Sequence, residues 1–311
     1  MIKNHIKLVQ YLTLSLMIAS FGVSFDAFWH LTKGRESFFV LPHLFVYGGS
    51  ILSIYFSWLG HRYIKKSEWT WIFRILLLIP LSAPLDELWH ILYGKEPVDS
   101  ITILWSPPHA LLFLSAMTVM ILTARMVKQT DRLKNKNLLG CILAGLFLNL
   151  AVIFMGPFYP TSPINILGSS GLGIIALVAL ITMFYTRRWF NDYGSASLTI
   201  GTFLILQMLL FDSNFYISED SNFFHMPDWN LILVYLVPAM IVDASDNWYT
   251  PSRGMIAGLL FGILFFGLGG LAPSSPFVYA DLWSGTITSA IGGIFAGFIF
   301  EHLIQNHKKP A

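Results

Sequence analysis

The stretches FDAFWHLTKGRESFFVLPHLF (residues 25–45) and LDELWHILYGKEPVDSITILWSPPHALLF (residues 85–113) place aspartate and histidine beside segments that are otherwise strongly apolar. Ionisable side chains within a bilayer are costly, so they are rare there and usually functional. Of the 311 residues, 55% are hydrophobic and 12% are charged, whereas a soluble domain carries about 25% charged residues. The composition therefore predicts an all-α integral membrane protein.

Apolar runs long enough to cross a bilayer, which takes roughly 20 residues, recur along the whole chain. We expect about ten transmembrane helices. Their approximate ranges are 8–30, 38–59, 70–92, 103–125, 138–157, 167–186, 195–212, 229–244, 254–272 and 283–302. The first run has no small-residue cleavage site behind it, so it is interpreted as a retained helix rather than a signal peptide.

The basic residues sort to one side of these spans. With the N-terminus in the cytoplasm, all but three of the 19 Lys and Arg residues fall on the cytoplasmic side; the exceptions are Lys33, Arg35 and Lys95. Cytoplasmic loops of membrane proteins carry an excess of Lys and Arg. The pattern therefore predicts cytoplasmic N- and C-termini in a plasma or inner cell membrane. Arg187 is interpreted as part of this topology signal.

The two quoted stretches are copies of one pattern. The matching pairs are Asp26 and Asp86, Trp29 and Trp89, His30 and His90, Gly34 and Gly94, and Glu36 and Glu96. Each copy then reaches a Pro-His pair, which ends at His43 or His109. Both copies run in the same direction across the membrane, so residues 1–136 are expected to form a four-helix core from a duplicated helical hairpin. Residues 137–311 lack a third copy and are expected to form a six-helix apolar half.

Each copy carries residue types that bind metals. An aspartate and a histidine four residues apart lie on one face of a helix, and a histidine at the start of the next helix can complete a set of three. We therefore predict two metal sites on the extracytoplasmic face, formed by Asp26, His30 and His43 and by Asp86, His90 and His109. Two imidazoles and one carboxylate with open positions suit iron, copper or zinc. A polar cap between the hairpins is the structural alternative.

Neighbouring residues have simpler interpretations. Trp29 and Trp89 are expected to anchor helix ends at the membrane interface, and Gly34 and Gly94 to allow turns after those ends. Cys141 is the only cysteine, which excludes an intramolecular disulfide and a CxxC metal site. No patch typical of nucleic-acid binding is present.

The segment DAFWHLTKGRESFFVLPH resembles the third (C), all-membrane subunit of the copper-dependent methane and ammonia monooxygenases. That family's pattern is roughly D-x-x-W-H-x-T-x-x-R-[DE]-[ST]-x-F-x-x-P-x-H, and the resemblance covers about residues 10–125. It implies two neighbouring copper sites, at the two residue sets given above. The second copy departs from the family, because Asp86 stands where the family has Asn and its loop to His109 is longer.

The resemblance implies a copper-dependent membrane monooxygenase, or its metal-bearing subunit, with Asp86, His90 and His109 as the catalytic site. Such a protein activates dioxygen to oxidise a small apolar substrate, takes electrons from an external donor, and works with further subunits or as a homo-oligomer. Two other functions fit the residues. Copper transport or assembly requires a polar path across the membrane, and a zinc-dependent membrane hydrolase uses the metal to activate water.

Overall fold

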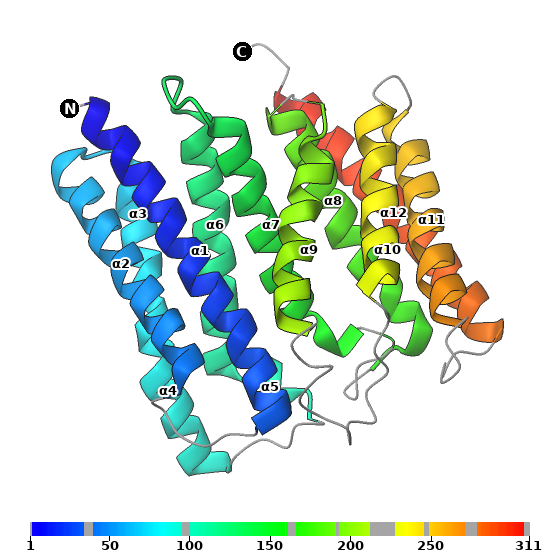
Figure 1. The fold of residues 1–311 in the computed structure, drawn as a ribbon, viewed down its shortest axis with the longest axis horizontal. Helices are drawn as coiled ribbons and strands as arrows, with labels where there is room; N and C mark the ends of the chain where they lie inside the picture. The colour runs from blue at the N-terminus through cyan, green and yellow to red at the C-terminus, as the bar shows by residue number, and fades with distance from the viewer. Residues whose placement is uncertain are drawn as a thin grey trace. The chain divides into compact units, whose positions relative to one another are not determined.

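The computed structural model describes residues 2–33, 40–94, 100–158, 160, 166–190, 193–211, 228–245, 249–270 and 279–307. Within these ranges the regular secondary structure is helical, with no strand (Figure 1). Seven helical segments among the described residues, with Ser67–Tyr93 counted as one, are long and apolar enough to cross a membrane, which supports a multi-pass helical membrane protein. The count of ten spans and the cytoplasmic placing of both termini stay predictions.

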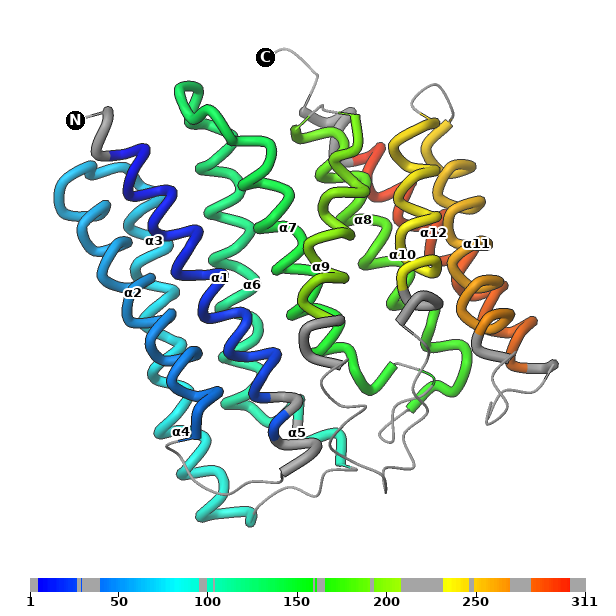
Figure 2. The backbone as a smooth tube through the Cα atoms, viewed as in Figure 1, coloured from blue at the N-terminus to red at the C-terminus, as the bar shows by residue number. Residues whose placement is uncertain are grey.

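The first of two compact units contains Met1–Phe154, whose helices run back and forth as a bundle (Figure 2). Its helices are α1 (Ile2–Lys33), α2 (Leu41–Tyr63), α3 (Ser67–Leu76), α4 (Leu78–Tyr93), α5 (Thr102–Trp105), α6 (Pro107–Lys128) and α7 (Lys136–Phe154). The predicted boundary at residue 136 assigned α7 to the second half of the chain. In the structure α7 packs on α6 and α1, so this unit extends to the end of α7.

Prolines explain why the third predicted span consists of two helices. Helix α3 ends at Leu76 and α4 begins at Leu78. Pro80 has no N–H to donate to the carbonyl of Leu76, four residues earlier, and Pro84 leaves the carbonyl of Pro80 without its usual donor. Missing bonds of this kind interrupt or kink a helix. Asp86 and His90 therefore lie on α4, a separate helix that begins within the predicted third span.

His5 ties together one end of the first unit. The indole N–H of Trp69, on α3, donates to Nδ1 of His5 at 3.3 Å, and Oγ1 of Thr130, just after α6, lies 3.4 Å from Nε2. Through these hydrogen bonds, the start of α1 contacts both the start of α3, next to the α2–α3 turn, and the α6–α7 connection. Because successive helices reverse direction, the predicted Asp and His ligands lie at the opposite end of the unit.

The second unit contains Met155–Met208 and Asp220–Ala311. Its helices are η1 (Gly156–Phe158), η2 (Gly168–Gly171), α8 (Leu172–Phe190), α9 (Ser195–Phe211), α10 (Asp228–Ala244), α11 (Thr250–Gly270) and α12 (Tyr279–His307). Helices α11 and α12 pack most extensively, and both contact α8. The α11–α12 contact is close because glycines face each other: a Cβ added at Gly254 would lie 2.0 Å from the carbonyl oxygen of Gly293.

A buried ion pair in the second unit was not predicted. The carboxylate of Asp243, on α10, accepts hydrogen bonds from the backbone N–H groups of Ala196 and Ser197 at 3.1 and 2.9 Å, at the start of α9. Its Oδ1 lies 3.8 Å from Nε of Arg187, and both charged side chains are buried. Arg187, interpreted from the sequence as a topology signal, is therefore also part of the core.

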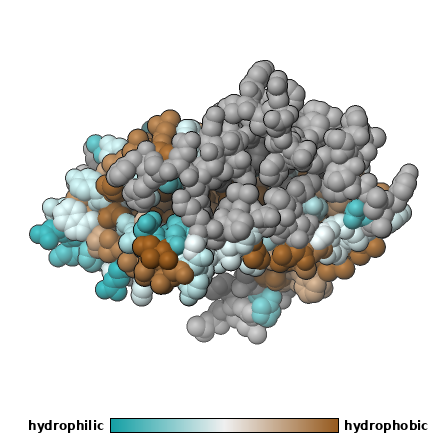
Figure 3. All heavy atoms as spheres, turned by 90° about the horizontal axis from the view of Figure 1, so that it is seen from below, coloured by the Kyte–Doolittle hydropathy of each residue, from teal (hydrophilic) through white to brown (hydrophobic). Residues whose placement is uncertain are grey.

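Apolar side chains reach the outer surface of the described helices (Figure 3). Ile91 on α4 is 71% exposed, and Trp283 on α12 is 66% exposed. Soluble monomers rarely leave large contiguous apolar patches in water. These outer faces are therefore typical of helices that contact lipid.

Candidate metal centre

The second copy of the motif brings its three predicted ligands together. Asp86 and His90 are one turn apart on α4, and Nε2 of His90 lies 3.2 Å from Oδ2 of Asp86. His109, on α6, places its Nε2 3.3 Å from Oδ1 of the same carboxylate. The three side chains are between 14% and 28% exposed. One partly buried carboxylate thus contacts both imidazoles, each through a different oxygen.

Prolines determine where the two returning helices begin. Pro107 and Pro108 are the first two residues of α6, and His109 is the third. Proline suits the first turn because its φ is already helical and its missing N–H would have no partner there. Pro42 is likewise the second residue of α2, and His43 is the third. Each Pro-His pair therefore places its histidine in the first turn of a helix, facing the end of the preceding span.

The first copy shows the same inter-helix contact. Nε2 of His43, on α2, lies 2.9 Å from Oδ1 of Asp26, on α1. This contact is the counterpart of the one between His109 and Asp86. His30 lies on α1 one turn after Asp26, but its side chain is outside the described residues, as are Gly34, Glu36 and Glu96.

Tyr47 lies close to both copies, although the sequence did not single it out. Its ring centroid is 5.7 Å from that of His43, one turn earlier on α2. The carboxylates of Asp26 and Asp86 both act electrostatically on its hydroxyl group. The signal that could have revealed it is the four-residue spacing from His43, which puts both rings on one face of the helix. The two Asp-His contacts are therefore neighbours at one end of the first unit.

The donor types fit a metal ion, but their described positions are those of ion pairs. Within the part of the chain that the structure describes, no three His, Cys, Asp or Glu side chains are arranged to hold a metal. His90 and His109 each contact a different oxygen of Asp86. Two imidazoles and a carboxylate remain a donor set for copper, iron or zinc.

Gly94 ends α4 one turn after His90. Its φ is 81° and its ψ is 173°, a combination that is essentially restricted to glycine. Its N–H donates to the carbonyl of His90 at 3.0 Å. The turn predicted at Gly94 is thus confirmed, and it fixes where the helix that carries two candidate ligands stops.

Replacing Gly94 with alanine is expected to lower the free energy of unfolding by about 1–3 kcal/mol. Nothing lies within 4 Å of the added Cβ, so the cost is backbone strain alone. Gly48→Ala is the matched control, because Gly48 also faces open space but has ordinary helical geometry, where alanine is favoured by roughly 1 kcal/mol. Thermal unfolding in detergent, followed by tryptophan fluorescence, compares them. A Gly94→Ala protein as stable as the wild type would contradict this account.

No protein-family model, curated protein or solved structure matches this chain. The likeness of its duplicated motif to the membrane subunit of copper monooxygenases therefore stays a prediction.

Proposed function

We propose that the chain is a copper-binding membrane monooxygenase, or the metal-bearing subunit of one, with its metal at Asp86, His90 and His109. The observation that carries the proposal is the contact of one carboxylate with two imidazoles on two helices. The contact between His43 and Asp26 repeats half of this arrangement. Two equivalent contacts in one chain favour a shared chemical role over two unrelated polar caps, with Asp26, His30 and His43 as the second proposed site.

The residues of the proposed site have separate roles. His90 and His109 supply imidazole nitrogens, while Asp86 supplies a carboxylate oxygen and offsets part of the ion's charge. Copper, when bound, would supply the one-electron chemistry that dioxygen activation requires. Inserting one oxygen atom into a C–H bond and reducing the other to water consumes a pair of electrons and a pair of protons. The chain encodes no second redox cofactor motif, so we propose an external donor such as a quinol.

Helix α4 offers a small apolar substrate a route from the bilayer. Leu88, Ile91 and Leu92 are 49%, 71% and 64% exposed, and they alternate along the chain with Asp86 and His90. The candidate metal ligands and the exposed apolar side chains thus lie on the same short helix, α4. A hydrocarbon-like molecule dissolved in the membrane would meet these apolar side chains on the helix that carries the candidate ligands, which supports a small apolar substrate class.

We propose that the site faces the extracytoplasmic side of a plasma or inner membrane. The excess of Lys and Arg in the alternate loops supports this orientation. Within the first unit, the basic α2–α3 turn, with Arg62, Lys65 and Lys66, lies at the end opposite the Asp-His contacts. The Asp and His side chains and the basic loops are therefore separated by the length of the helices.

Metal content and turnover test the proposal. The full chain, purified in nanodiscs without a metal-affinity tag, is expected to retain copper by mass spectrometry and to consume dioxygen when given a quinol and a small hydrocarbon. Protein stripped by a chelator and reloaded with zinc is the control, because zinc accepts the same ligands but has no redox chemistry.

A chain that neither retains nor takes up copper would contradict the proposal. Hydrolysis by the zinc form would favour a hydrolase, and copper bound without turnover would favour transport or assembly.

A further inference from the structure

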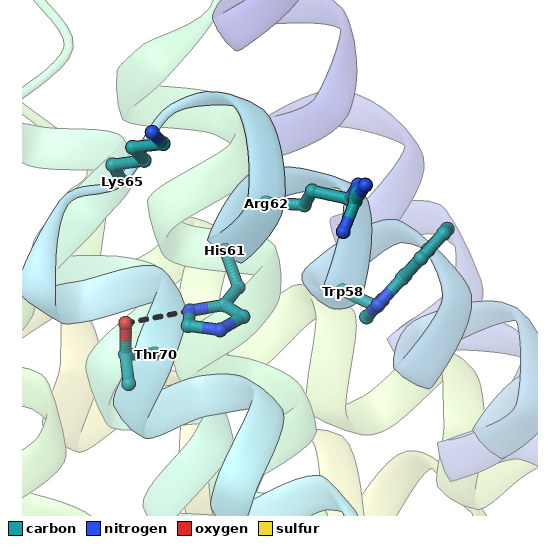
Figure 4. Close-up of a pocket in the computed structure, with 5 residues that line it drawn as sticks. All are labelled: Trp58, His61, Arg62, Lys65 and Thr70. Carbon is teal, nitrogen blue, oxygen red and sulfur yellow. Dashed lines mark hydrogen bonds between the residues drawn. The ribbon is translucent and has the colours of Figure 1, made fainter.

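A second candidate site lies at the end of the first unit opposite the Asp and His ligands. A cavity of about 390 Å³ opens beside the turn between α2 and α3 (Figure 4). Its volume falls in the range of small-ligand sites, about 300–1,000 Å³. The described residues that line it include two permanent cations and no carboxylate; they are Trp58, His61, Arg62, Lys65 and Thr70. The cavity is therefore electropositive.

The inner wall of the cavity is held in place by His61. Nδ1 of His61 lies 2.9 Å from Oγ1 of Thr70, which joins α2 to α3. The His61 ring also stacks on Phe73, with ring centroids 5.7 Å apart and planes 11° from parallel. Figure 4 shows this ring between Lys65 on one side and Arg62, with Trp58, on the other. The two cations thus flank a fixed aromatic wall.

The backbone at Lys65 has an unusual conformation. Lys65 has a φ of 58° and is the only non-glycine residue with positive φ among those the structure describes. The N–H groups of Ile64 and Lys65 donate to the carbonyl of Gly60 at 2.9 and 3.3 Å, which closes the end of α2. Glycine or asparagine usually occupies such a position after a helix. Strained backbone at a non-glycine residue is characteristic of ligand sites, and here it keeps a cation beside the cavity.

We propose that this cavity binds a phosphate-bearing anion, and that the ligand is the headgroup of an anionic membrane lipid. A guanidinium pairs with phosphate oxygens through two parallel hydrogen bonds, and an ammonium adds a point charge, so Arg62 and Lys65 match phosphate chemistry. Trp58, Tyr63 and Trp71 are exposed around the same turn. Exposed Trp and Tyr concentrate at the level of lipid headgroups, which places the cavity where lipid phosphates are.

Removing the two cations should weaken lipid binding far more than an equal loss of charge elsewhere. A basic residue that contacts an anionic lipid headgroup strengthens its binding about fivefold, so Arg62→Gln with Lys65→Gln should weaken it roughly 25-fold. The matched control is Arg132→Gln with Lys134→Gln, in the exposed α6–α7 connection at the same end of the unit and outside the cavity. Its expected change is below about twofold if the cavity, rather than total charge, selects the lipid.

Lys65→Gly separates binding from folding. Glycine relieves the positive-φ strain, so this variant should unfold at a higher temperature than the wild type while binding anionic lipid about fivefold more weakly. A structural role for Lys65 would instead change stability and binding in the same direction. Such parallel loss would overturn the proposal.

Native mass spectrometry of the full chain, titrated with phosphatidylglycerol or phosphatidylcholine, measures the binding. We expect preferential binding of phosphatidylglycerol that is lost in the cavity variant, kept in the control, and resistant to excess inorganic phosphate. Displacement by inorganic phosphate would uphold the phosphate site but assign it to a soluble phosphate compound. Equal binding of the two lipids, or equal loss in both double variants, would overturn the site.

Discussion

Adding one methyl group at Gly254 is expected to break a close backbone contact between α11 and α12 in the second unit. In Gly254→Ala the new Cβ would lie 2.0 Å from the carbonyl oxygen of Gly293 and 2.8 Å from its carbonyl carbon. These are backbone atoms, which cannot move aside as the end of a flexible side chain can. Helices α11 and α12 would have to separate along their length, so we expect the free energy of unfolding to fall by about 3 kcal/mol, the upper end for overpacking.

Gly267→Ala is the control for this prediction. Gly267 lies on the same helix, α11, but no atom lies within 4 Å of a Cβ added there, so alanine should stabilise the helix by up to about 1 kcal/mol. Thermal unfolding and size-exclusion chromatography of both variants in the same detergent give the comparison. Similar melting temperatures for Gly254→Ala and Gly267→Ala would show that the two helices are not in the close contact described.

Asp86→Ala is expected to abolish copper binding at the second site and any dioxygen consumption that depends on it. The Asp86 carboxylate contacts both imidazoles, so its loss removes one ligand and the group that orients the other two. Copper per chain should fall to the amount that the first copy alone retains, measured by mass spectrometry on protein purified without an affinity tag. Unchanged copper and unchanged turnover would rule out Asp86 as a ligand.

Glu87→Ala is the matched control, because it removes the same charge from the adjacent position of α4. It should leave copper content unchanged. Asp86→Asn distinguishes charge from donor atom, since an amide keeps a carbonyl oxygen. Because that oxygen is still a possible ligand, we expect this variant to retain more copper than Asp86→Ala. Equal loss of copper in Glu87→Ala and Asp86→Ala would attribute the effect to net charge.

The sequence predicted the helices well, and in each predicted metal site an aspartate and a histidine from neighbouring helices lie in contact. Each of the ten predicted segments contains a helix, because long apolar runs are a strong signal of helix in a membrane. The contacts of His43 with Asp26 and of His109 with Asp86 follow from the repeat, since an aspartate near the end of one span meets a histidine at the start of the next. The third ligand of the first copy, His30, lies outside the described side chains.

Other features depend on packing that a single sequence does not reveal. Pro80 and Pro84 are visible in the sequence, but a proline can kink a membrane helix or end it, and neighbouring helices decide which. The approach of Tyr47 to both aspartates and the pairing of Asp243 with Arg187 join segments that only the fold brings together. The grouping of α7 with the first unit likewise follows from contacts rather than from composition.

Under the proposed metal-binding role, the shared direction of the two hairpins turns both sites toward the same compartment. Both Asp-His contacts lie at one end of the first unit, beside the same tyrosine. In sealed vesicles, a membrane-impermeant chelator added on that side would reach both sites, and one added on the other side would reach neither. The metal concentration, redox potential and pH of that one compartment would then apply to both sites. Under the proposed metal-binding role, a duplication in this orientation places both sites on one reservoir-facing surface.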